Sequence, residues 1–182
     1  GYQGGASRSG WSRNVAEMNF GAPMKEALSE PGPWSMGITA FGEILPYHEN
    51  TIKLSKDKVD KWGISILEID AEIKENEKKM RIDMMNDAAE MLEAAGLKNV
   101  NTFDAGYTFG QGIHEMGTAR MGRDPKTSVL NGNNQVWDAK NVFVTDGACM
   151  TSAAAQNPSL TYMALTARAA DFAVSELKKG NL

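Results

Sequence analysis

Apolar and polar residues alternate in two stretches of the first half of the chain. Residues 51–55 read Thr-Ile-Lys-Leu-Ser. In residues 64–73, every second side chain would lie on the same face of an extended strand, and both faces carry apolar residues. A period of two is typical of a β-strand. The run Ser35–Leu45 is rich in apolar and β-branched residues, so we predict a third strand there, with a turn at Tyr47–Asn50 leading to the next.

Two longer stretches have a helical period instead. Residues 75–95 place apolar side chains three and four positions apart, and Gly96 follows as a natural terminator. Residues 158–179 show the same spacing and end at Gly180. We expect this second helix to bury one stripe, formed by Leu160, Met163, Ala167, Ala170, Val174 and Leu177. A short helix is predicted over Pro23–Glu30.

The other segments are predicted as loops and short strands. We interpret Gly1–Gly10 as a surface or interdomain loop, because residues 5–12 have the glycine spacing of a phosphate-binding loop but lack its lysine. Short strands are expected at 129–130 and 135–137 around the turn Asn131–Asn134, and a buried strand at Val142–Val144. Strands followed by a helix predict an α+β fold in which helices cover an antiparallel sheet.

The charge and composition exclude several classes of protein. The net charge of −4, from 19 basic and 23 acidic residues, leaves no electrostatic footprint for nucleic acid. Cys149 is the single cysteine, so neither an intramolecular disulfide nor a cysteine-rich metal site can form. No apolar run approaches the roughly 20 residues that span a bilayer. The chain opens without Met in a glycine-rich stretch, and we interpret it as part of a longer protein whose location the sequence does not reveal.

His114 is the first candidate for chemistry. It lies in the first motif, residues 112–122, which reads Gly-Ile-His-Glu-Met-Gly-Thr-Ala-Arg-Met-Gly. No second His or carboxylate stands at ligand spacing, and His48 is expected in a solvated turn, so no metal site is predicted. A lone histidine can act as a general base or simply be a satisfied structural side chain. A hydrolase would lack a nucleophile, because neither Ser128 nor Ser159 has the required setting.

Asn157 is the second candidate, and it too has two interpretations. It suits the N-cap of the last helix, with Pro158 at the first helical position, where its missing N–H does no harm. The N-terminus of that helix also carries partial positive charge and free N–H groups, which favour a nearby anion such as a reduced flavin ring. Cap and anion site are compatible with one another.

Three motifs in this order and spacing resemble the C-terminal region of the glucose–methanol–choline (GMC) oxidoreductases. They are the first motif, the second motif Asn-Val-Phe-Val-Thr-Asp-Gly-Ala at 141–148, and the third motif Asn-Pro-Ser at 157–159. The resemblance extends over about Glu43 to Leu182, and a long C-terminal helix follows the third motif as in that family. It implies an FAD-binding domain joined to a substrate domain built on an antiparallel sheet.

The resemblance also implies roles for individual residues. His114 stands at the position of the base that takes the hydroxyl proton while hydride leaves the carbinol carbon for flavin N5. Asn157 stands at the second catalytic position, where an amide can hydrogen-bond the substrate oxygen but cannot accept its proton. The His–Asn pair is similar to the catalytic pair of the branch that contains pyranose oxidase and the sugar or polyol dehydrogenases. The residues implied to approach the flavin are Asp146, Gly147, Asn157, Pro158 and Ser159.

The implied organisation has three parts. Residues 1–42 form a loop-rich lead-in to the substrate domain, residues 43–140 carry the substrate-domain region with the His114 motif, and residues 141–182 supply a strand and a helix that complete the FAD-binding domain. The family's N-terminal Gly-x-Gly-x-x-Gly unit, which grips the ADP half of FAD, is absent from this sequence. We therefore expect the chain alone to bind FAD weakly and to be inactive.

The expected partners follow from the same resemblance. The substrate is an alcohol, a sugar or a polyol, and a quinone or a protein is a candidate electron acceptor; the sequence does not distinguish oxidase from dehydrogenase. The alternative function is a non-catalytic binding module of the same fold. Flavin absorbance that a sugar or polyol bleaches would separate the two.

Overall fold

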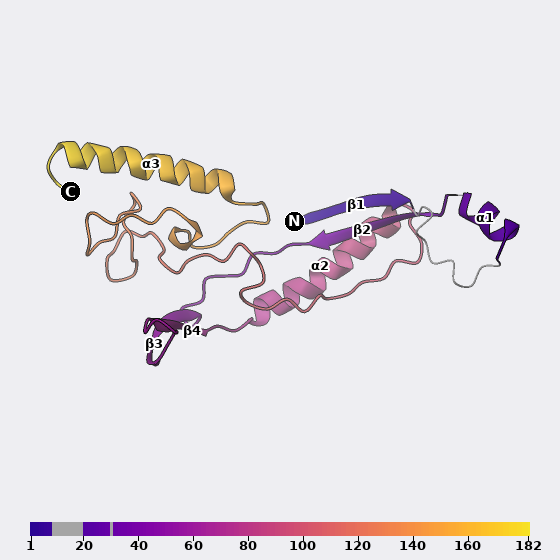
Figure 1. Ribbon diagram of the computed structural model, residues 1–182, viewed down its shortest axis with the longest axis horizontal. Coiled ribbons are helices and arrows are strands. Elements are labelled where there is room, and N and C mark those ends of the chain that lie inside the picture. The colour runs from indigo at the N-terminus through magenta and orange to yellow at the C-terminus, as the bar shows by residue number, and fades with distance from the viewer. Residues whose placement is uncertain (9–19, 30) are drawn as a thin grey trace. The chain divides into compact units, whose positions relative to one another are not determined.

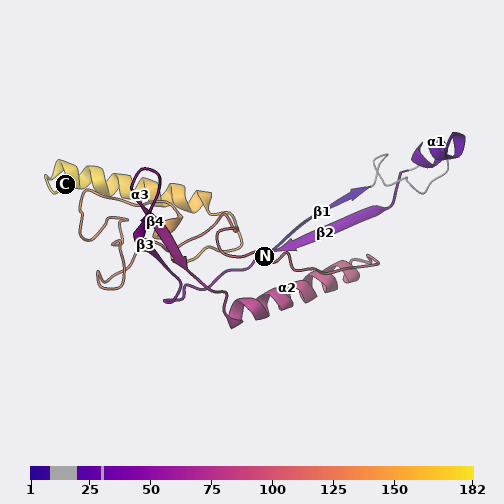
Figure 2. The same ribbon diagram turned by 60° about the horizontal axis from the view of Figure 1, so that its bottom comes forward.

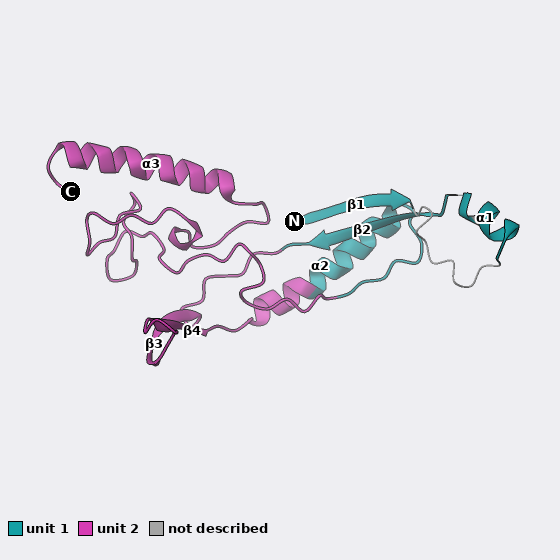
Figure 3. Cartoon of the chain, in the orientation of Figure 1, with its two compact units in different colours: residues 1–41, 82–103 teal, residues 42–81, 104–182 magenta. Residues whose placement is uncertain are grey.

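The computed structural model describes residues 1–8, 20–29 and 31–182. The elements labelled in Figure 1 are β1 (Tyr2–Arg8), α1 (Ala22–Ser29), β2 (Trp34–Ala40), β3 (Thr51–Val59), β4 (Ser65–Asp70), α2 (Glu75–Ala94) and α3 (Ser159–Lys178). A short 3-10 helix, η1 (Gly147–Cys149), precedes α3. The chain divides into two compact units, residues 1–41 with 82–103 and residues 42–81 with 104–182 (Figure 3).

The first unit contains an antiparallel pair of strands, β1 and β2. They pair from Tyr2↔Ala40 to Arg8↔Trp34 and lie side by side in both ribbon views (Figures 1 and 2). The loop expected at Gly1–Gly10 is therefore wrong for residues 2–8, while residues 9 and 10 lie outside the described part of the chain. A Cβ at Gly4 would collide with the carbonyl oxygen of Gly37. This glycine thus permits a close backbone approach rather than marking a loop.

The helix α1 and the strand β2 confirm the expected elements at 23–30 and 35–45, although β2 ends at Ala40 and Glu30 is not described. The turn at Tyr47–Asn50 does not connect two paired strands, because β2 pairs with β1 and β3 pairs with β4. His48 lies exposed in that turn, as predicted.

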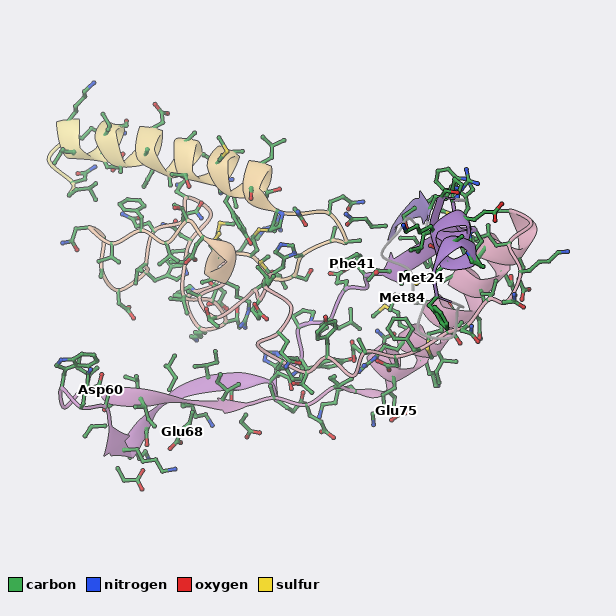
Figure 4. All side chains as sticks on the ribbon, turned by 45° about the vertical axis from the view of Figure 1, so that its right-hand side comes forward. Met24, Phe41, Asp60, Glu68, Glu75 and Met84 are labelled. Atoms are coloured by element: carbon green, nitrogen blue, oxygen red, sulfur yellow. The ribbon has the colours of Figure 1, made fainter. Side chains whose placement is uncertain are left out.

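In the second unit, β3 and β4 form an antiparallel hairpin that confirms the strands expected at 51–55 and 64–73. Asp60 lies at its tip (Figure 4), where Oδ1 accepts the backbone N–H groups of Trp62 at 2.8 Å and Ile64 at 3.0 Å. The register shifts between Leu54 and Val59. The buried Ser55 hydroxyl donates to Glu68 Oε1 at 2.7 Å beside this irregularity.

The α+β class is confirmed, with helices and small antiparallel sheets. The expectation of one larger antiparallel sheet is not met in the described residues, where the four strands form two separate two-stranded sheets. Alternation predicts strands but not which strands pair, because pairing depends on contacts distant in sequence. One face of the hairpin carries exposed apolar side chains, namely Ile52, Leu54, Leu67 and Ile69.

The helix α2 confirms the element expected at 75–95, and both of its ends have a clear cause. At the C-terminus, Gly96 has a φ of +85°. The Gly96 N–H donates to Glu93 O at 2.9 Å and the Leu97 N–H to Leu92 O at 3.1 Å, which is a Schellman motif. Met80 and Met84 are half-buried, in keeping with a packing role.

At the N-terminus of α2, Glu77 is buried, and the residue is only 2% exposed. It accepts the backbone N–H groups of Lys74 and Leu45, each at 3.2 Å, and the Tyr47 hydroxyl at 3.2 Å. The bond to Lys74 is the backward arm of a capping box, and the other two tie the preceding segment to the helix.

Burial alone would raise the pKa of the Glu77 carboxyl, but hydrogen bonds from the Leu45 backbone and the Asn76 side chain hold that pKa below its usual value. Such a carboxylate stabilises the fold above its unfolded pKa, about 4.3, and this stabilisation is lost as pH falls through the folded pKa. In the full-length protein, Glu77→Gln should lower the free energy of unfolding by about 1–3 kcal/mol near neutral pH. Near pH 3, urea unfolding should show a much smaller difference in the free energy of unfolding between Glu77→Gln and the parent. An equal loss at both pH values would refute the prediction.

Candidate active site

The first and second motifs lie side by side in the second unit. The Gly117 N–H donates to Gly147 O at 3.3 Å, and the Ala119 N–H donates to Ala148 O at 2.9 Å. The Met121 N–H continues the series to Cys149 O at 2.9 Å. These backbone bonds bring the segment that carries His114 against the segment that carries Asp146, although about thirty positions of sequence separate them.

The helix α3, which follows the third motif, contacts the first motif. The Tyr162 hydroxyl donates to Met116 Sδ at 3.4 Å, and Tyr162 lies in the first turn of the helix. All three motifs therefore belong to one connected region of the chain. His114 is half-buried and Asn157 is exposed. The convergence of these two side chains on one substrate atom stays a prediction.

Gly147 is the point of closest packing between the motifs. A Cβ there would lie 2.9 Å from both Met116 Sδ and Tyr162 Oη, and 3.0 Å from the Glu115 carbonyl oxygen. Asp146, one residue earlier, accepts the Ala148 N–H at 3.0 Å and so caps the short helix η1. A larger residue at 147 must therefore displace the side chains of Met116 and Tyr162 and crowd the Glu115 carbonyl beside His114.

We expect Gly147→Ala in the full-length protein to lower the free energy of unfolding by about 1–3 kcal/mol, the usual cost of overpacking. Gly132→Ala is the matched control, because a Cβ at Gly132 meets nothing within 4 Å. Urea unfolding of both variants checks the difference. Equal stability of the two variants would contradict the close approach at Gly147.

The strand expected at Val142–Val144 is replaced by irregular backbone with a single bridge, Gln135↔Phe143. The two short strands expected around Asn131–Asn134 are likewise isolated bridges, Leu130↔Val136 and Met121↔Leu130. The turn itself is present, since the Asn134 N–H donates to Asn131 O at 3.2 Å. These short apolar runs are anchored by side chains rather than by a regular ladder of strands.

Asn134 is the main anchor of this irregular region, and its side chain is fully buried. Its Nδ2 donates to Val144 O at 2.9 Å, and its Oδ1 accepts Arg168 Nη2 of α3 at 3.0 Å. Arg168 Nη2 also lies 3.4 Å from Met121 Sδ, in the first motif. Sequence reasoning missed Asn134 and Arg168 as a pair, because 34 positions separate them.

The start of α3 differs by one residue from the prediction. Pro158, not Asn157, occupies the N-cap position, and its carbonyl accepts the Tyr162 N–H at 3.1 Å. Within the described residues, no side chain caps this terminus. Asn157 therefore precedes the helix, and the capping role is wrong. The end at Gly180 is confirmed: φ is +74°, and the Asn181 N–H donates to Glu176 O at 3.0 Å.

The buried stripe expected on α3 is also wrong. Leu160 is 79% exposed and Leu177 63% exposed. The opposite face packs instead, with Ala169 buried and Phe172 meeting Phe143 edge to face at a centroid distance of 6.3 Å. The helix has apolar residues on both faces, so periodicity alone cannot tell which face this chain covers.

Two titratable side chains are kept neutral in this region. Burial raises the pKa of the Cys149 thiol, and burial followed by the charge of Asp146 raises the pKa of the Tyr162 hydroxyl. Cys149 is thus a packed thiol rather than a reactive thiolate. Tyr162 remains a hydrogen-bond donor toward Met116.

Two further findings concern the whole described part of the chain. Nowhere in residues 1–8, 20–29 and 31–182 do three or more His, Cys, Asp or Glu side chains gather as a metal site would require. No helix in that part of the chain is long and apolar enough to cross a membrane.

A family model described as GMC oxidoreductase matches residues 46–166, which include the three motifs and the first turns of α3. The chain belongs to the GMC oxidoreductase family. This confirms the resemblance carried by the three motifs.

Several curated proteins are similar to the chain. It is 39% identical over 74% of its length to 2-methyl-1,2-propanediol dehydrogenase of Mycolicibacterium austroafricanum. It is 29% identical over 99% of its length to the fructose dehydrogenase large subunit of Gluconobacter japonicus. It is 30% identical over 81% of its length to the gluconate 2-dehydrogenase flavoprotein of Pantoea cypripedii. The matched regions cover 24%, 33% and 25% of these relatives, so the chain spans about a quarter to a third of their length.

Proposed function

We propose that this chain supplies the substrate-facing part of the active site of an FAD-dependent oxidoreductase that oxidises a CH–OH group of an alcohol, with a sugar or polyol as the substrate class. The observation that carries the proposal is the backbone pairing of Gly117, Ala119 and Met121 with residues 147–149. It joins the histidine motif to the motif that resembles a flavin-contacting segment. The names of the relatives, which are dehydrogenases of a diol, fructose and gluconate, agree with this substrate class.

His114 acts as the general base in this proposal. A neutral imidazole takes the proton of the substrate hydroxyl, and histidine is the side chain that most often performs this task. Asn157 donates an amide hydrogen bond to the same oxygen and cannot take the proton. When bound, FAD supplies the chemistry that the chain lacks, by accepting hydride at N5.

The residues that would hold FAD are Asp146 and Gly147 together with Asn157, Pro158 and Ser159. The geometry supports this assignment at one point. The N-terminus of α3 has no side-chain cap among the described residues, so its first N–H groups can face an anion.

The two apolar faces of α3 support a further part of the proposal. One face packs on this chain through Ala169 and Phe172, and the other exposes Leu160, Met163, Val174 and Leu177. A helix that is apolar on both faces is typical of a buried helix. We assign residues 141–182 to the completion of the FAD-binding domain and residues 43–140 to the substrate domain. A quinone or a protein remains the candidate electron acceptor.

Anaerobic titration of the purified full-length protein tests the function. We expect a flavin absorbance band, and we expect a panel of sugars, polyols and simple alcohols to contain a compound that bleaches it. A protein without flavin, or a flavin that no compound with a CH–OH group bleaches, would favour the non-catalytic binding module instead.

A further inference from the structure

The backbone immediately before His114 has an unusual conformation. Ile113 has a φ of +69°, in the left-handed region that β-branched residues avoid. Its side chain is 88% exposed, so burial does not hold it in place. Some other interaction of this segment must therefore stabilise the conformation.

The side chain of Glu115 provides that interaction. Its Oε1 accepts the Gly112 N–H at 2.9 Å, which closes a small ring of chain around Ile113 and His114. On the far side of His114, the Gly117 N–H donates to Gly147 O at 3.3 Å. The histidine is thus held on its N-terminal side by the bond from Gly112 to Glu115, and on its C-terminal side by the bond from Gly117 to Gly147.

The direction of the His114 side chain depends on the backbone of this ring. Without the Glu115 bond, Ile113 can relax toward a negative φ, which rotates the peptide that leads into His114. A base must lie within hydrogen-bond reach of its proton, and a misplacement of about 1 Å can cost about a hundredfold in rate. The carboxylate of Glu115 is itself exposed and bonds to the backbone, so its removal should disturb the fold little.

We propose that Glu115 is a positioning residue for His114: by accepting the Gly112 N–H, its side chain holds Ile113 in the left-handed conformation and fixes the direction of the imidazole. This rests on the proposed role of His114 as the base. A hydrogen-bond acceptor is what the position requires, rather than a negative charge. Glutamine, which keeps an acceptor oxygen on a side chain of the same length, therefore fulfils the role.

The test uses the flavin-loaded full-length protein and three variants. Glu115→Ala removes the acceptor, Glu115→Gln keeps it, and Glu43→Ala removes an exposed carboxylate elsewhere in the same unit. The readouts are the rate constant of flavin reduction at saturating substrate, KM, flavin content and melting temperature. We expect Glu115→Ala to slow reduction about tenfold with flavin content and melting temperature unchanged, and the other two variants to stay within about twofold of the parent.

Two results would overturn the proposal. One is a Glu115→Ala variant that keeps the parent's rate, and the other is a Glu115→Gln variant that is as slow as the alanine variant. His114→Ala, measured alongside, separates this proposal from the proposed function. If His114→Ala is slow while Glu115→Ala is not, only the positioning role fails. If His114→Ala keeps the parent's rate, the assigned base itself is wrong.

Discussion

His114→Ala in the full-length protein should slow the reduction of its flavin by substrate by a factor of about 10² to 10⁴, the usual contribution of a positioned general base. The reason is that the proposed mechanism gives the proton transfer to His114 alone, since the amide of Asn157 cannot accept the hydroxyl proton. Anaerobic stopped-flow absorbance of the flavin measures this rate constant directly. Asn157→Ala should slow flavin reduction less than His114→Ala, because it removes a hydrogen bond to the substrate and not the base.

The chain provides a matched control for this experiment. It has two histidines, and His48 lies exposed in the turn that precedes β3. His48→Ala should reduce flavin at the parent's rate. A His114→Ala variant that binds flavin normally and is reduced as fast as the His48→Ala variant would remove His114 from the mechanism.

Asn134→Ala should lower the free energy of unfolding by about 3 kcal/mol. The substitution leaves the half-buried Val144 carbonyl without its partner, at a cost of about 1–3 kcal/mol, whereas the exposed Arg168 guanidinium can bind water instead. It also places alanine at a φ of +64°, a left-handed conformation that adds roughly 1–2 kcal/mol. Because these contributions overlap, their full sum is not expected. Urea unfolding of the full-length protein measures the loss.

A glycine variant separates the two causes. Asn134→Gly removes the same hydrogen bonds but adopts a positive φ without strain. Asn134→Gly should therefore regain only the free energy of unfolding that the strained alanine lost. Most of the decrease relative to the parent should persist. Stability of Asn134→Gly equal to that of the parent would show that the hydrogen bonds of Asn134 contribute little.

The long helices could be predicted from the sequence because their signals are local. The apolar spacing in α2 and α3 defines each helix, and Gly96 and Gly180 end them in the left-handed conformation that only glycine adopts easily. The strand β1 could not be predicted in the same way. Its glycines resemble a loop, and only the partner β2, about thirty positions further on, shows that Gly4 allows a close approach.

The candidate site was predictable as a set of motifs but not as a geometry. The family resemblance implied that the His114 and Asp146 segments belong to one site, and the backbone bonds from Gly117 and Ala119 join these segments. The Asn134–Arg168 contact was not predictable, because neither residue belongs to a recognisable motif. The cap at Asn157 was misplaced by one residue, since the choice between two adjacent positions depends on backbone angles that residue preference does not determine.

We propose above all that His114 and Asn157 share one substrate hydroxyl. An experimental structure of the full-length protein with FAD and an unreactive substrate analogue tests it most directly. We expect a ring nitrogen of His114 and the side-chain amide nitrogen of Asn157 both to lie about 3 Å from the same analogue oxygen. That oxygen should be on the face of the flavin from which the substrate approaches N5. Side chains that point to opposite faces of an ordered structure, or an analogue oxygen held by other residues, would contradict it.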